Sequence, residues 1–174
     1  MYIQRSIDQQ LLEWKQSSVH KPLLLRGARK IGKSSAIRHL GETFRHYIEV
    51  NFEKRPELKE LFEKTSDVHQ LATRLGMLYN VPIEAGKTLV FLDEIQACPE
   101  AIKSLWFFKE DFPELHVVAA GSLLEFALKE LTSYGVGRIR SLFMYPLSFD
   151  EFLQAQGKAS WIEEKRKADH NHPL

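Results

Sequence analysis

The chain has 174 residues, of which 44% are hydrophobic and 27% are charged, so it is long enough for one domain with a hydrophobic core and too short for two. Its 24 lysines and arginines against 23 acidic residues give a formal net charge of +1, which does not support a nucleic-acid or membrane-surface partner. The single cysteine, Cys98, excludes an internal disulfide, and neither a signal peptide nor an apolar run of roughly 18 residues is found, so we expect a cytoplasmic protein.

The N-terminal quarter alternates predicted helices and strands. Residues 6–17 have apolar side chains at helical spacing and predict an amphipathic helix. The apolar run 23–25 is typical of a strand buried on both faces of a parallel sheet, and residues 33–44 predict the helix that follows it. Residues 47–52 alternate apolar and polar side chains and predict a second strand.

The same alternation continues to residue 144. The further predicted elements are helices from Pro56 and after Ser66, a strand at 88–92, a helix from Pro99, a strand at 115–120, a helix through Leu131 and a strand at 139–144. Alternating strands and helices predict an α/β fold, a parallel sheet with helices on both faces. We assign residues 1–159 to this domain and residues 160–174 to a charged C-terminal tail, which is either a frayed helix or the start of a longer chain.

The first predicted strand leads into a glycine-rich loop with phosphate-binding spacing, Gly27-x-x-x-x-Gly32-Lys33-Ser34. In such a loop the backbone N–H groups and the following helix N-terminus bind phosphate, the lysine adds positive charge and the serine hydroxyl is a magnesium ligand. The alternative is a glycine turn before an ordinary helix. The predicted nucleotide-binding segment is Gly27, Ala28, Arg29, Lys30, Ile31, Gly32, Lys33, Ser34 and Ser35.

An acidic pair follows the apolar strand at 88–92. Asp93 comes at the carboxyl end of this strand, where open α/β sheets bind ligands, and suits magnesium coordination. Glu94 is then available to polarise the water that attacks the terminal phosphate. The alternative is a polar strand end that leads into a loop.

Two polar residues in the last third of the chain are further catalytic candidates. Ser122 follows the strand at 115–120, where its hydroxyl can reach a terminal phosphate, but Ser122-x-x-Glu125 is also a helix capping box. Arg138 begins the last predicted strand and can stabilise transition-state charge, within the chain or from a neighbouring subunit, and Arg140 can substitute for it. A surface ion pair is the alternative for Arg138.

These segments together resemble the bacterial and archaeal predicted ATPases of the AAA superfamily. The resemblance covers about residues 1–155 and rests on LLLRGARKIGKSS, LVFLDEIQ, AAGSLLEF, GVGRIR and, as the most family-specific stretch, YPLSFDEF at 145–152. It implies the three-layer P-loop NTPase fold, with a five-stranded parallel sheet in the order 5-1-4-3-2. ATP and magnesium are the implied cofactors.

The resemblance also implies roles for individual residues. Gly27, Gly32, Lys33 and Ser34 would form the phosphate loop, with Asp93 and Glu94 as the magnesium and catalytic pair, Ser122 as a sensor and Arg138 as the family's arginine. Two features depart from the family. Lys30 replaces a common glutamine, and the C-terminal domain that usually follows is missing, so either that domain or a second copy of the chain is the expected partner.

The sequence leaves three activities open. We expect a magnesium-dependent ATPase; the alternatives are a nucleotide-binding switch with little turnover and a small-molecule kinase. The adjacent acidic pair Asp93-Glu94 argues against the kinase, because a kinase gains nothing from activating water.

Overall fold

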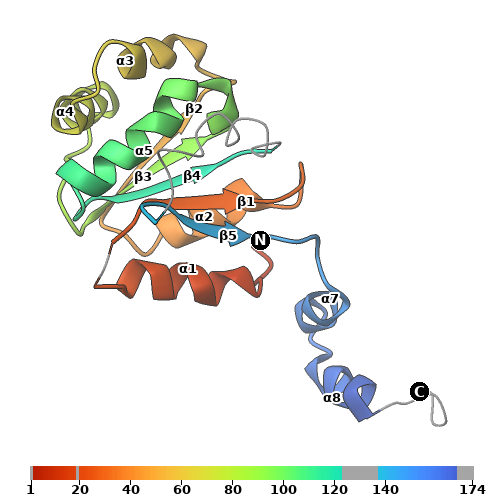
Figure 1. Ribbon diagram of the computed structural model, residues 1–174. Helices are drawn as coiled ribbons and strands as arrows, with labels where there is room; N and C mark the ends of the chain where they lie inside the picture. The colour runs from red at the N-terminus through yellow and green to blue at the C-terminus, as the bar shows by residue number, and fades with distance from the viewer. Residues whose placement is uncertain (1, 19, 123–136, 168–174) are drawn as a thin grey trace.

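The computed structural model describes residues 2–18, 20–122 and 137–167. Within them the strands form one five-stranded parallel sheet in the order β2-β3-β4-β1-β5. The strands are β1 (Leu23–Arg26), β2 (His46–Asn51), β3 (Thr88–Asp93), β4 (His116–Ala120) and β5 (Arg140–Phe143). This is the predicted order read from the opposite edge, so both the α/β class and the strand order are confirmed (Figure 1).

Helices cover both faces of the sheet, which gives three layers (Figure 1). One face carries α1 (Ile7–Gln16) and α2 (Lys33–Gly41), and the other carries α3 (Lys59–Glu63), α4 (Val68–Tyr79) and α5 (Pro99–Asp111). Short 3-10 turns, η1 (Pro56–Leu58) and η2 (Ile95–Ala97), precede α3 and α5. The helix predicted through Leu131 lies outside the described residues.

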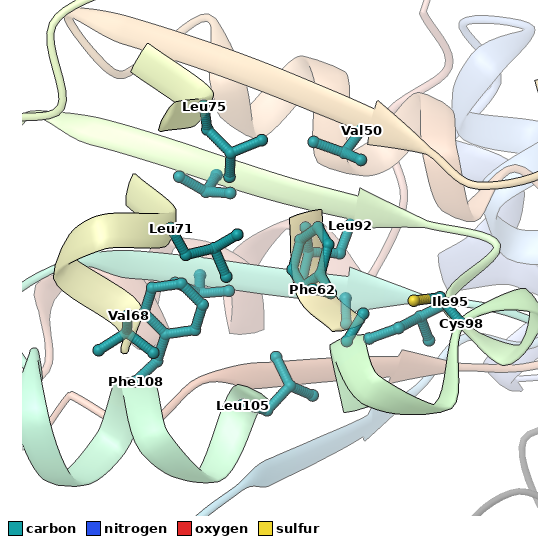
Figure 2. Close-up of a cluster of buried hydrophobic side chains, with 14 of the residues drawn as sticks. Val50, Phe62, Val68, Leu71, Leu75, Leu92, Ile95, Cys98, Leu105 and Phe108 are labelled. Carbon is teal, nitrogen blue, oxygen red and sulfur yellow. The ribbon is translucent and has the colours of Figure 1, made fainter. Parts of the chain in front are cut away.

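The apolar strands supply two separate cores because successive side chains point to opposite faces of a sheet. Leu23 and Leu25 pack against α1 and α2, whereas Leu24 between them belongs to the cluster under α3, α4 and α5. Figure 2 shows this second cluster, whose labelled members are Val50, Phe62, Val68, Leu71, Leu75, Leu92, Ile95, Cys98, Leu105 and Phe108. Cys98 therefore has a packing role, and β1 is buried on both sides as its leucine run predicts.

The structure corrects the length of the helix that follows the glycine loop. We predict residues 33–44 as helix, but α2 ends at Gly41. Beyond this point the chain tightens into turns, in which the backbone N–H groups of Thr43 and Phe44 donate to the carbonyls of Leu40 and Gly41. These bonds span three residues instead of four, so the apolar side chain of Phe44 reaches the core from a turn.

After β5 the chain forms α7 (Phe149–Ala155) and α8 (Ala159–Lys167), which lie beyond the sheet in Figure 1. A capping box begins α7: the Ser148 hydroxyl accepts from the Glu151 N–H, and the Glu151 carboxylate accepts from the Ser148 N–H. The predicted boundary between residues 159 and 160 falls at the start of α8 and stays a prediction. Among the described helices, none has the length and apolar content needed to cross a bilayer.

Candidate functional site

The loop between β1 and α2 has a backbone that only particular residues tolerate. Gly27 and Gly32 have φ values of 145° and 100°, and Lys30 between them has a φ of 63°. A Cβ atom at Gly27 would lie 2.3 Å from the carbonyl oxygen of Met144, which follows β5. The positive φ of Gly27 and the close approach of the Met144 carbonyl both require a residue without a Cβ atom at position 27. The loop thus lies at the carboxyl edge of the sheet, tightly against the chain that leaves β5.

We expect Gly27→Ala to lower the free energy of unfolding by about 3 kcal/mol, since it adds a steric clash to left-handed backbone strain. Gly86→Ala is the matched control, because Gly86 also has a positive φ of 72° but no atom within 4 Å of its added Cβ. The control should lose only about 1 kcal/mol. Urea unfolding of both variants measures the difference, and equal losses would show that the contact with Met144 relaxes without cost.

Lys33 folds back over the loop that precedes it. Its Nζ donates to the carbonyls of Gly27 at 3.0 Å and Ala28 at 2.7 Å, and its side chain is buried. Burial lowers the pKa of Lys33, while the nearby carboxylates of Glu94 and Asp93 act in the opposite direction. The ammonium group lies against the carbonyls of the first two loop residues, where it can meet an anionic ligand.

Ser34, Asp93 and Asn51 come together beside this lysine. The Ser34 hydroxyl lies 3.1 Å from both carboxylate oxygens of Asp93, and Asn51 Nδ2 donates to Asp93 Oδ2 at 2.9 Å. Burial raises the pKa of Asp93 against the opposing effect of the Ser34 hydrogen bond. The sequence indicated Ser34 and Asp93 but missed Asn51, which is the register partner of Asp93 at the end of β2.

Glu94 turns sharply away from the strand. It has φ 51° and ψ 46°, in the left-handed region that a glutamate enters only at a cost of about 1–2 kcal/mol. Its side chain is half-buried, and its Oε2 accepts a hydrogen bond from Gln96 Nε2 at 2.7 Å. Local strain of this kind concentrates at functional sites, where the fold holds a side chain in a required position.

The remaining loop residues differ in their exposure. Ala28, Arg29, Lys30 and Ser35 are exposed, and Ile31 is half-buried. Arg29 forms a loose ion pair with Glu53, with Nη2 3.8 Å from Oε2. The Arg29 side chain is 70% exposed, so this ion pair lies on the surface.

Ser122 follows β4 by two residues and is half-buried. Ala120, the last residue of β4, is the register partner of Asp93 and also of Leu25 in β1. Ser122 is therefore at the same edge of the sheet as the acidic pair and the loop. Its predicted capping partner, Glu125, lies outside the described residues.

Arg138 lies at the amino end of the strands, opposite the carboxyl end where the loop lies. It precedes β5, and the first residue of this strand, Arg140, is the register partner of Leu23 at the start of β1. Since the strands are parallel, the loop is at the opposite end of β1. Arg138 Nε donates to Glu110 Oε1 at 2.8 Å, and its guanidinium lies 5.3 Å from the ring centroid of Trp106. In this arrangement it forms the surface ion pair that the sequence left as the alternative.

The oxygen-rich cluster beside the loop fits a magnesium ion. Hard divalent cations prefer oxygen ligands, and Ser34 and Asp93 offer a hydroxyl and a carboxylate that already face each other. No group of three or more His, Cys, Asp or Glu side chains in the described part of the chain is arranged to hold a metal. A site with one or two protein ligands is typical of magnesium, which keeps most of its ligands as water and phosphate oxygens.

Comparison with known proteins identifies the family. The family model described as an AAA domain matches residues 19–153. Among solved structures, the chain resembles the Walker-type ATPase PABY2304 of Pyrococcus abyssi, with 22% sequence identity and a TM-score of 0.60. The likeness covers 97% of this chain and 60% of that one, and it bears on the fold alone. Comparison with curated proteins finds no match. Because the family model spans most of the chain, including the loop and the acidic pair, the chain belongs to the AAA domain family.

Proposed function

We propose that this chain binds ATP with magnesium and hydrolyses it to ADP and phosphate. The observation that carries the proposal is the meeting of Ser34 from α2 and Asp93 from β3, 3.1 Å apart, next to the buried Lys33 of the glycine loop. Membership of the AAA domain family supports nucleotide binding. The alternative, a glycine turn before an ordinary helix, would not require a buried lysine, a buried aspartate and a serine to meet at one strand end.

Each residue then has a defined task. The backbone N–H groups of residues 27–33 and the N-terminus of α2 would bind the phosphates, and Lys33 would exchange its carbonyl contacts for phosphate oxygens. Ser34 and Asp93 would hold magnesium, which neutralises charge on the terminal phosphates. Ser35 in α2 and Ser122 after β4 would add hydroxyl contacts to phosphate.

Glu94 would accept a proton from the attacking water. As the water oxygen bonds to the terminal phosphorus, the bond to the bridging oxygen of ADP breaks, and ADP leaves as the anion. The left-handed backbone at Glu94 supports this role, because it turns the side chain out of the line of β3. We place this reaction in the cytoplasm, with ATP as the substrate.

Release of phosphate from ATP by the purified protein, with and without magnesium, tests the activity. Magnesium-dependent release is the expected result. ATP that raises the melting temperature without being consumed would identify a nucleotide-binding switch instead, and transfer of phosphate to an added metabolite would identify a kinase.

We infer that a catalytic role of Arg138 would be exercised from a second copy of the chain. Arg138 is at the amino end of β5, so it is far along the strand direction from the loop of its own chain. An arginine supplied by a neighbour can accelerate phosphate release by about 10³-fold or more. We expect Arg138→Ala and Lys33→Ala, each inactive alone, to regain activity when mixed. Unchanged activity of Arg138→Ala alone would leave this residue with the ion pair to Glu110 only.

A further inference from the structure

An arginine outside the phosphate-binding motif contacts the loop. Arg5 lies just before α1, and its side chain is only 9% exposed. Its Nη1 donates to the carbonyl of Ile31 at 3.0 Å, and its Nη2 donates to the carbonyl of Tyr145 at 2.9 Å. The planar guanidinium thus joins the loop to the segment that follows β5, two regions more than 100 residues apart.

Glu151 in α7 holds this arginine in place. Its Oε2 lies 3.2 Å from Arg5 Nε, which makes an ion pair although the two groups are not aligned for a hydrogen bond. The carboxylate also accepts from the Ser6 N–H and hydroxyl at 2.8 and 2.9 Å and from the Ser148 N–H at 2.8 Å. Burial alone would raise the pKa of Glu151, but these hydrogen bonds lower it to about 2. The carboxylate is therefore charged at neutral pH and fixed from three sides.

The contact to Ile31 determines the orientation of one peptide group in the loop. No described peptide bond is cis, so the carbonyl of Ile31 and the N–H of Gly32 point in opposite directions. Holding the carbonyl on Arg5 directs the Gly32 N–H away from Arg5. Lys30 and Gly32 on either side both have positive φ, and Gly32 is directly followed by Lys33. A glycine beside this peptide leaves it free to rotate unless something holds it.

We propose that Arg5 and Glu151 are positioning residues that fix the peptide between Ile31 and Gly32, and that they thereby set the affinity of the loop for nucleotide. This inference rests on the proposed nucleotide binding. Neither side chain needs to touch the nucleotide, because Arg5 acts through the Ile31 carbonyl and Glu151 acts through Arg5. The segment 145–152 thus connects α7 to the phosphate loop, and Glu151 within it has a role at the site.

The test is titration of ATP with magnesium into wild type, Arg5→Gln, Arg5→Lys and Glu151→Gln. We expect Arg5→Gln to weaken ATP binding about 10- to 100-fold, the range for loss of a hydrogen bond to a charged group. Arg5→Lys keeps the charge but cannot reach both carbonyls, so its affinity should be intermediate. Glu151→Gln should resemble Arg5→Lys, because it removes the ion pair and leaves the guanidinium.

Lys15→Gln is the matched control. Lys15 is at the other end of α1 and also joins a cationic side chain to a backbone carbonyl, with Nζ 2.7 Å from the carbonyl oxygen of Thr43. It does not contact the loop. Its removal should change ATP affinity by no more than about 2-fold, as expected for an exposed contact of this type.

Hydrogen exchange of the nucleotide-free protein separates positioning from general destabilisation. In Arg5→Gln the amides of residues 27–33 should exchange faster, while those of β3 at 88–93 keep their wild-type rate. Unchanged loop exchange and unchanged ATP affinity would overturn the proposal, as would equal acceleration in β3. The milder Arg5→Lys variant decides in the same way if Arg5→Gln does not fold. Wild type that fails to bind ATP would overturn the proposed function, and loop exchange would still decide whether Arg5 orders the loop.

Discussion

Glu94→Gln is expected to reduce phosphate release by about 10²- to 10⁴-fold, the usual contribution of a general base. Glutamine has nearly the same size but cannot accept the proton of the attacking water. ATP affinity should remain within a few-fold of wild type, because the phosphate contacts assigned to Lys33 and the loop do not involve Glu94. The measurement is single-turnover phosphate release beside ATP titration, and the variant should retain bound ATP.

Glu53→Gln is the control for loss of a negative charge near the loop. Glu53 pairs with Arg29 of the loop at 3.8 Å but lies on the surface, so its removal should leave phosphate release nearly unchanged. If Glu94→Gln released phosphate at the wild-type rate, Glu94 would have no role as the base. Equal losses in both variants would point to charge near the loop and not to proton transfer.

Asp93→Asn should remove the magnesium dependence of ATP binding and lower phosphate release by about 100-fold or more, consistent with loss of transition-state charge stabilisation. The substitution keeps the shape of a side chain that is 4% exposed and hydrogen-bonded to Ser34 and Asn51, but removes its charge. The measurement is ATP titration with magnesium and with a chelator. The two affinities should differ in wild type and coincide in the variant.

Asp67→Asn provides the matched control. Asp67 caps α4 by accepting from the N–H groups of His69 and Gln70, and asparagine caps nearly as well. This variant should keep the wild-type response to magnesium. A wild-type response in Asp93→Asn as well would contradict the assignment of Asp93 as the metal ligand.

Local sequence patterns predict the parts of the fold that depend on residues close together in the sequence. The leucine run of β1, the glycine spacing of the loop and the helix after Gly32 follow each other directly, so the strand, loop and helix could be placed without any tertiary contact. Asp93 could be placed at the carboxyl end of β3 for the same reason. The strand order was implied by the family resemblance, because local pattern does not say which strands are neighbours.

The site contacts that the sequence did not predict join residues that are far apart in the chain and meet only in the tertiary structure. Asn51 reaches Asp93 because β2 and β3 pair in a particular register. Arg5 and Glu151 are 146 positions apart and meet because the chain returns to α1 after β5. The pattern Ser148-x-x-Glu151 could have predicted the start of α7, but not the use of the same carboxylate by Ser6. Placement of Arg138 likewise depends on the direction of β5 relative to the loop.

The site contains groups that are costly in the folded protein without a ligand. Lys33 is buried against carbonyls, Asp93 is buried with a raised pKa, and Glu94 has left-handed backbone. Such features lower the stability of a fold, and they persist where a function requires them. A nucleotide with magnesium would offset two of these costs at once, by pairing phosphate with Lys33 and a cation with Asp93.

Calorimetric titration of ATP and GTP with magnesium into wild type and Lys33→Ala tests the central claim most directly. We predict saturable binding of ATP to wild type and its loss in Lys33→Ala, with the GTP titration giving the base preference. Absence of binding to wild type, or equal affinity in the two proteins, would contradict the assignment of the loop as a phosphate-binding site.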